Sequence, residues 1–89
     1  MGDLKTDYKY IYFIERPNPG KKTKRYTCHN NKSHIELGTV RWESRWRQYV
    51  FEVPLVQPED PAWWVYFSRG CLRDIIDFID QLMEERKNA

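Results

Sequence analysis

The sequence has few of the residues and patterns on which most catalytic sites, metal centres and membrane anchors depend. It contains two cysteines and two histidines in 89 residues, and its four glycines are scattered, so no phosphate-binding glycine loop occurs. No apolar run approaches the length of a membrane-spanning helix, and residues 1–10 lack the apolar segment of a signal peptide. The sequence therefore predicts a cytoplasmic protein with no membrane partner.

The scarcity of metal ligands and nucleophiles also bears on catalysis. Cys28, His29, His34 and Cys71 could be imagined around a metal, but Cys28 and His29 are neighbours and would point to opposite faces of a strand. Carboxylates recur on one face of the C-terminal segment, where a solubilising role is the simpler interpretation. Because no nucleophile has a recognisable base, we expect no metal, no cofactor and no enzymatic activity.

Aromatic residues are plentiful by contrast. Hydrophobic residues make up 40% of the chain and aromatic residues 16%, enough to build one core without disulfides. A chain of 89 residues is too short to divide between two cores. We therefore expect residues 1–89 to form a single domain.

The spacing of apolar residues predicts an α+β fold. Alternating aromatic and β-branched residues predict strands at about 8–15, 24–29, 35–43 and 46–53, with a turn at 43–45 and a β-bulge at Gly38, where the alternation changes phase. Residues 63–67 are either a short fifth strand or an apolar lead-in to the helix. Ser68 is a suitable N-cap, and apolar residues at three- and four-residue spacing predict a helix at about 69–87. The expected architecture is an antiparallel meander sheet of four to five strands, packed by one C-terminal helix.

Charge is divided unevenly along the chain. Residues 16–47 contain nine basic residues against two acidic ones, whereas residues 59–89 contain seven acidic residues against four basic ones. We expect a basic sheet and an acidic helix, an arrangement that could offer its positive side to an anionic partner.

The third and fourth predicted strands contain a cluster of arginine and tryptophan. Arginine grips phosphate and an exposed indole stacks on a base, which suits nucleic acid. The spacing of Trp42 and Trp46 nevertheless favours inward-facing core positions around the hairpin, with the arginines pointing outward. Trp63 and Trp64 are adjacent, so in an extended segment one of them should be exposed as an anchor for a protein partner. The predicted nucleic-acid-binding residues are Lys21, Lys22, Lys24, Arg25, Arg41, Arg45 and Arg47.

Two segments resemble small uncharacterised proteins of phages, prophages and bacteria. Those proteins combine a strand pair of the form LGx(I/V)xW and WRxYxFxP with a helix that opens CLxxIxxFI. The spacer before the helix departs from that pattern, since VQPEDPAWWVY is longer and more aromatic. The resemblance implies a meander sheet plus helix and a mobile-element origin, without an established activity. The matching residues are Leu37, Gly38, Val40, Trp42, Trp46, Arg47, Tyr49, Phe51, Pro54, Cys71, Leu72, Ile75, Phe78 and Ile79.

Three functions are compatible with these observations. The first is a non-catalytic module that binds nucleic acid through the basic side of the sheet. The second is an inhibitor or adaptor that binds a host protein, such as a defence enzyme, through the loop with Trp63 and Trp64 and the acidic face of the helix. The third is sequestration of a signalling nucleotide between aromatic and arginine side chains. The oligomeric state stays open, with a homodimer among the options.

Overall fold

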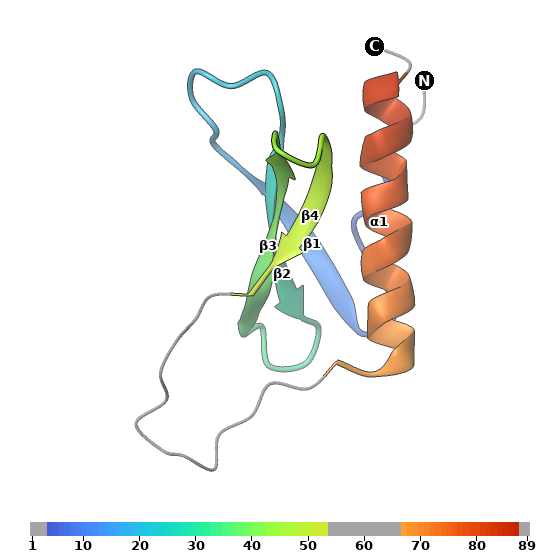
Figure 1. Cartoon of the computed structure of the whole chain (residues 1–89). Coiled ribbons are helices and arrows are strands. Elements are labelled where there is room, and N and C mark those ends of the chain that lie inside the picture. The colour runs from blue at the N-terminus through green and yellow to red at the C-terminus, as the bar shows by residue number, and fades with distance from the viewer. Residues whose placement is uncertain (1–3, 54–66, 88–89) are drawn as a thin grey trace.

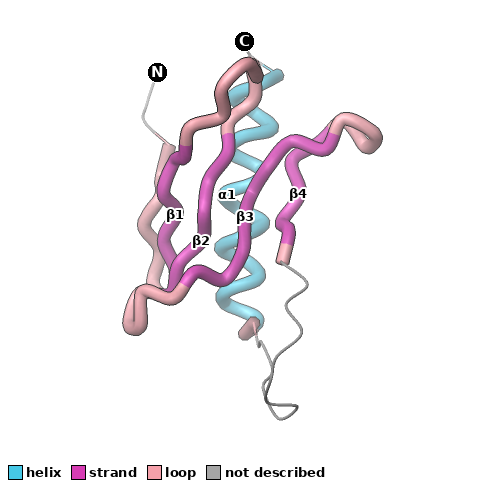
Figure 2. Tube along the Cα trace, turned by 90° about the vertical axis from the view of Figure 1, so that its left-hand side faces the viewer, coloured by secondary structure: helices cyan, strands magenta, loops and turns pink. Residues whose placement is uncertain are grey.

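The protein folds as a four-stranded sheet covered on one face by a helix. The structure is a computed structural model that describes residues 4–53 and 67–87. Its elements are β1 (Ile11–Arg16), β2 (Arg25–Asn30), β3 (Glu36–Glu43), β4 (Gln48–Glu52) and α1 (Arg69–Lys87). All neighbouring strands are antiparallel and follow the order β1-β2-β3-β4, and α1 lies across a single face of the sheet (Figures 1 and 2). The predicted α+β meander with one C-terminal helix is confirmed.

The first strand is shorter than predicted because the chain folds back beside it. β1 begins at Ile11 rather than Tyr8, and the Phe13 N–H donates to the carbonyl of Thr6 at 2.9 Å. A bridge between Asp7 and Tyr12 continues this pairing. The segment before β1 therefore covers the outer edge of that strand.

The turn between β3 and β4 is longer than predicted, and this changes the position of Trp46. β4 begins at Gln48 rather than at residue 46, and the turn extends through Arg47, whose φ of 54° is left-handed. Trp46 consequently belongs to the turn and is 66% exposed, so its expected core position is wrong. Trp42 does pack inward, with its ring centroid 5.3 Å from that of Tyr49.

The predicted bulge falls beside Gly38. Cys28 pairs with Gly38 and His29 pairs with Glu36, which leaves Leu37 as the extra residue of β3. A Cβ atom on Gly38 would lie 2.6 Å from Cζ of Phe51. The backbone carbonyl oxygen of Glu52 would lie 2.8 Å from the same Cβ atom, so glycine is required here because neither β4 contact leaves room for a side chain.

The core forms where α1 meets the sheet. Ser68 caps the helix, since its hydroxyl accepts from the Cys71 N–H at 3.1 Å. Phe78 is fully buried and stacks on Phe13 with a centroid distance of 4.0 Å, while Tyr26 meets its edge at 4.8 Å. In the described part of the chain, no helix has both the length and the apolar character needed to cross a membrane.

Two sequence predictions fall wholly or mostly outside the described residues. Trp63 and Trp64, the predicted protein-binding residues, belong to neither described range, and the same holds for 63–66 of the optional fifth strand. Phe67 is described and is not in a strand. Its ring lies edge-on to that of Phe51, with centroids 5.6 Å apart, as expected for a lead-in to the helix.

Candidate functional site

The sheet has a second face, directed away from α1, which we call the outer face. Ile11, Phe13, Tyr26, Cys28 and Val40 are buried towards the helix. Successive strand residues point to opposite sides, so their neighbours form the outer face. The outer face consists of Tyr12, Ile14, Arg16, Arg25, Thr27, His29, Glu36, Thr39, Arg41, Glu43, Gln48, Val50 and Glu52.

Hydrogen bonds order the polar side chains of the outer face over β1 and β2. The Arg16 Nε–H donates to the Thr27 hydroxyl at 2.9 Å, and the same hydroxyl lies 2.8 Å from His29 Nε2. Tyr12 stacks on the His29 ring with centroids 5.2 Å apart and shares a 2.9 Å hydrogen bond with His34 Nδ1. Thr27 and His29 are buried beneath these side chains. This half of the face is held in place by its own contacts.

A glutamate organises the arginines over β3 and β4. Arg45 Nη2 lies 3.0 Å from Glu43 Oε1, and the Arg45 backbone N–H donates to Glu43 Oε2 at 3.1 Å. Arg41 Nη2 lies 3.4 Å from Glu43 and 3.0 Å from Glu52. Hydrogen bonds from Arg45 are the main cause that lowers the pKa of Glu43 to about 2. Glu43 therefore stays ionised and neutralises part of the charge of both arginines.

A different pair of arginines lacks such a partner. Arg16 and Arg25 are direct cross-strand partners on the outer face. Within residues 4–53 and 67–87, neither forms an ion pair with a carboxylate. Like charges directly opposite each other in a sheet are destabilising. This pair concentrates positive charge at one point of the face.

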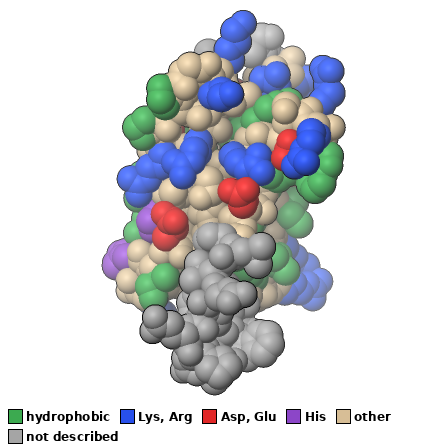
Figure 3. Space-filling model, turned by 60° about the vertical axis from the view of Figure 1, so that its left-hand side comes forward, with side chains coloured by type: hydrophobic (Ala, Val, Ile, Leu, Met, Phe, Trp, Pro, Cys, Tyr) green, Lys and Arg blue, Asp and Glu red, His purple; other side chains and the backbone are tan. Residues whose placement is uncertain are grey.

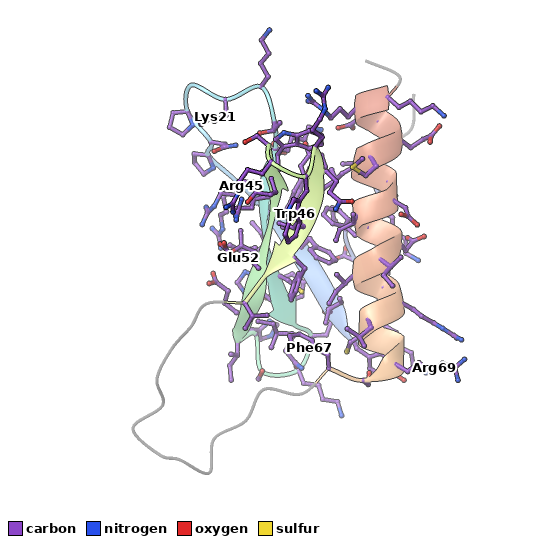
Figure 4. The ribbon with its side chains drawn as sticks, in the orientation of Figure 1. Lys21, Arg45, Trp46, Glu52, Phe67 and Arg69 are labelled. Atoms are coloured by element: carbon purple, nitrogen blue, oxygen red, sulfur yellow. The ribbon has the colours of Figure 1, made fainter. Side chains whose placement is uncertain are left out.

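Figure 3 shows where the basic side chains gather: Lys and Arg form a band across the side of the sheet that faces away from the helix. Lys21 and Lys22 are exposed in the loop between β1 and β2, which leans away from α1 (Figures 1 and 4). The structure thus brings these lysines to the same side as Arg25, Arg41 and Arg45.

One of the predicted basic residues turns away from the outer face, another ends the β3–β4 turn, and one basic residue of the outer face was missed. Lys24 turns towards the helix, where its Nζ lies 2.8 Å from Glu85 and the pKa of Lys24 is raised by that hydrogen bond. Arg47 is exposed at the end of the turn. Arg16 belongs to the outer face but was not predicted as a site residue. The alternation of residues along β1 could have placed it there, had the register with β2 been known.

The comparisons with known proteins give the chain a family. No protein-family model matches it, and no solved structure matches it. A protein of Acholeplasma phage L2, described as "Uncharacterized 9.3 kDa protein", is 34% identical over 79 residues, which cover 89% of this chain and 91% of the phage protein. The chain belongs to the family of this phage protein. The expected similarity to small uncharacterised phage proteins is confirmed at that level.

The phage relationship leaves the chemistry to be argued from the described residues. Among those residues, no three histidine, cysteine, aspartate or glutamate side chains come close enough together to hold a metal. Cys28 is fully buried, and burial raises the pKa of its thiol to about 12, so it is not a nucleophile at neutral pH. The outer face instead offers guanidinium and ammonium groups, which bind anions.

Proposed function

We propose that this member of the phage family binds nucleic acid through a cationic face, made of Arg16, Lys21, Lys22, Arg25, Arg41 and Arg45. The observation that carries the proposal is the Arg16–Arg25 pair, in which two guanidinium groups occupy opposite positions on β1 and β2 without a carboxylate partner among the described residues. A phosphate placed between them would offset the repulsion of the pair. Arginine is well suited to this role because its planar fork donates two hydrogen bonds to a phosphate.

The preordered part of the face supports the same function. The Thr27 hydroxyl accepts from Arg16 Nε at 2.9 Å, which fixes the Arg16 side chain on the outer face and leaves its Nη groups as donors for a ligand. Side chains that are already ordered lose less conformational entropy when they bind. A ligand therefore meets a surface in which several donors are already positioned.

The width of the sheet favours a single strand as the ligand. Four strands at a spacing of about 4.8 Å span roughly 14 Å, whereas the major groove of B-DNA is about 12 Å wide. The sheet as a whole is thus too broad to enter that groove, while a flexible single strand can lie across it. We expect single-stranded DNA or RNA to bind more tightly than duplex.

The test is a salt titration with labelled oligonucleotides. Fluorescence anisotropy with single-stranded DNA, RNA and duplex DNA should give an affinity that falls linearly on a log–log scale with salt. Replacing both central arginines, Arg16→Gln with Arg25→Gln, should reduce the slope by about 1.4 for single strands, at about 0.7 per lost phosphate contact.

A matched double variant on the helix separates local contacts from net charge. Arg69→Gln with Arg73→Gln removes the same charge from exposed positions of α1, and Arg69 projects away from the sheet in Figure 4. This variant should retain the slope of the unmodified protein. Absence of binding to every oligonucleotide at low salt, or an equal loss in both double variants, would overturn the proposal.

A further inference from the structure

The two edges of the sheet differ in how they are covered. The outer edge of β1 is paired with the preceding segment, through Thr6, Asp7 and Tyr8. β4 forms the opposite edge, and no strand among the described residues pairs with its outer side. An unpaired edge presents a row of backbone donors and acceptors that can accept another strand.

The outward backbone groups of β4 can be identified from one contact. The Tyr49 N–H donates to Met83 Sδ at 3.4 Å, and a thioether sulfur is a weak acceptor. Antiparallel strands direct alternate residues to either neighbour, so the N–H and C=O of Phe51 point the same way as those of Tyr49. Within the described chain, no group outside β4 bonds to the Phe51 N–H on this side.

An apolar stripe of α1 runs beside this edge. Leu72, Ile76, Ile79 and Met83 recur at spacings of four, three and four, which places them on one side of the helix. Met83 fixes that side at the β4 edge through its contact with Tyr49. Leu72 is 48% exposed and Ile76 is 58% exposed, so the stripe is covered only in part.

Two more apolar side chains extend the same region. Trp46 lies in the turn that leads into β4 and appears alongside that strand in Figure 4, and Val53, exposed as well, follows its last residue. Figure 3 shows hydrophobic side chains along the β4 side of the molecule. We define the β4-edge strip as the outer edge of β4 together with Trp46, Val53, Leu72 and Ile76.

We infer that the β4-edge strip binds a second copy of this chain, with the two β4 strands antiparallel about a two-fold axis at Val50. This register places Tyr49 opposite Phe51 in both directions. Once the Tyr49 N–H exchanges its weak contact with Met83 Sδ for a carbonyl oxygen, the outward N–H and C=O groups of the two residues bond to one another. Gln48 then faces Glu52, and the Gln48 amide can donate to that carboxylate. No like charges lie opposite each other within Gln48–Glu52.

The apolar stripe of α1 is compatible with the same two-fold axis at Val50. Met83 contacts Tyr49, and Phe67, just before the helix, contacts Phe51, so Ile76 lies on α1 between two points that touch β4. A two-fold axis at Val50 brings Ile76 towards its own counterpart. The same surface thus serves both copies, as an isologous interface requires.

The pairing would join two sheets into one of twice the width. A two-fold axis perpendicular to the sheet leaves both helices on one side and both outer faces on the other. The two cationic faces would then form a continuous surface. The dimer does not depend on the proposed nucleic-acid binding, because its contacts are backbone and apolar groups.

Sedimentation velocity without nucleic acid tests the inference. The chain of 10.9 kDa should sediment at twice that mass at micromolar concentrations. Ile76→Lys should weaken the dimer about a hundredfold, since each copy loses an apolar contact worth about tenfold in affinity. Ile35→Lys is the matched control, because Ile35 is 61% exposed outside the strip, and it should leave the dimer unchanged.

Amide hydrogen exchange locates the interface. The Phe51 N–H should be protected in the unmodified protein and should exchange at least about tenfold faster in Ile76→Lys. A monomeric unmodified protein would overturn the inference. A dimer that survives Ile76→Lys, or one in which the Phe51 N–H exchanges freely, would do the same. Binding of oligonucleotides is measured separately, so either proposal can fail alone.

Discussion

Glu43 neutralises part of the positive charge of the outer face, so replacing it with a neutral residue should strengthen the binding of nucleic acid. Its carboxylate accepts from the side chain and backbone of Arg45 and lies beside Arg41. In Glu43→Gln both arginines lose this ionic partner, but Arg41 keeps Glu52 at 3.0 Å. The substitution therefore releases about one guanidinium, that of Arg45, whose side chain is 80% exposed.

The size of the effect on binding follows from the release of one guanidinium group. One additional phosphate contact should steepen the salt dependence of single-strand binding by about 0.7. Between 50 and 200 mM salt, a slope larger by that amount makes affinity fall by a further factor of about 2.6. Fluorescence anisotropy across that salt range measures both slopes. Affinity at the low-salt end should rise relative to the unmodified protein.

The control replaces a glutamate that has no arginine partner within the part of the chain that the structure describes. Glu36→Gln makes the same change in net charge at an exposed position of the outer face, at the start of β3, where the glutamate forms no ion pair with Arg41 or Arg45. It should leave the slope unaltered. If Glu43→Gln binds with an unchanged or shallower slope while its circular dichroism stays native, the assignment of Glu43 as a restraint on Arg45 is refuted.

Three further predictions concern stability and reactivity. The pKa of Glu43 in the folded state lies below its ordinary value of 4.5, so the stability that Glu43 contributes is present above pH 4.5 and is lost as pH falls towards 2. The free energy of unfolding of Glu43→Gln should therefore not show this loss between pH 4.5 and 2. Phe78→Ala should lower the free energy of unfolding by about 3–5 kcal/mol in urea titrations, against less than about 1 kcal/mol for Ile76→Ala. Gly38→Ala should destabilise by about 1–3 kcal/mol, since the new methyl group meets the Phe51 ring and the backbone carbonyl oxygen of Glu52. A neutral result would mean that the backbone of β4 shifts aside at little cost.

The elements of the fold could be predicted because their signals are local. The helix has an N-cap at Ser68 and an apolar repeat, and each strand has its own alternation, so no tertiary information was needed for the α+β class. The β3–β4 turn was misplaced by the same local logic. Residues Trp46 and Arg47 continue an alternating pattern, but Arg47 adopts a left-handed φ and places Trp46 in solvent. A period of two cannot distinguish a strand from a turn that happens to match it.

The candidate site was predicted only in part because pairing decides which charges meet. Sequence composition identified the basic half, yet Lys24 turns to Glu85 on the helix, and Glu43 ties down Arg41 and Arg45. These contacts depend on register and on the packing of α1. Neither can be obtained from composition, because residues far apart in the chain are involved.

The sequence by itself determined the type of each element, the aromatic core and the excess of basic residues in the sheet. These properties follow from side-chain chemistry and from periods of two and 3.6 residues, which act within one segment. Only the tertiary structure decided that Arg16 stands opposite Arg25, that Trp46 is exposed and that no strand among the described residues pairs with the outer side of β4. Such juxtapositions arise when strands align and a helix covers one face, so they belong to the assembled molecule rather than to any segment of it.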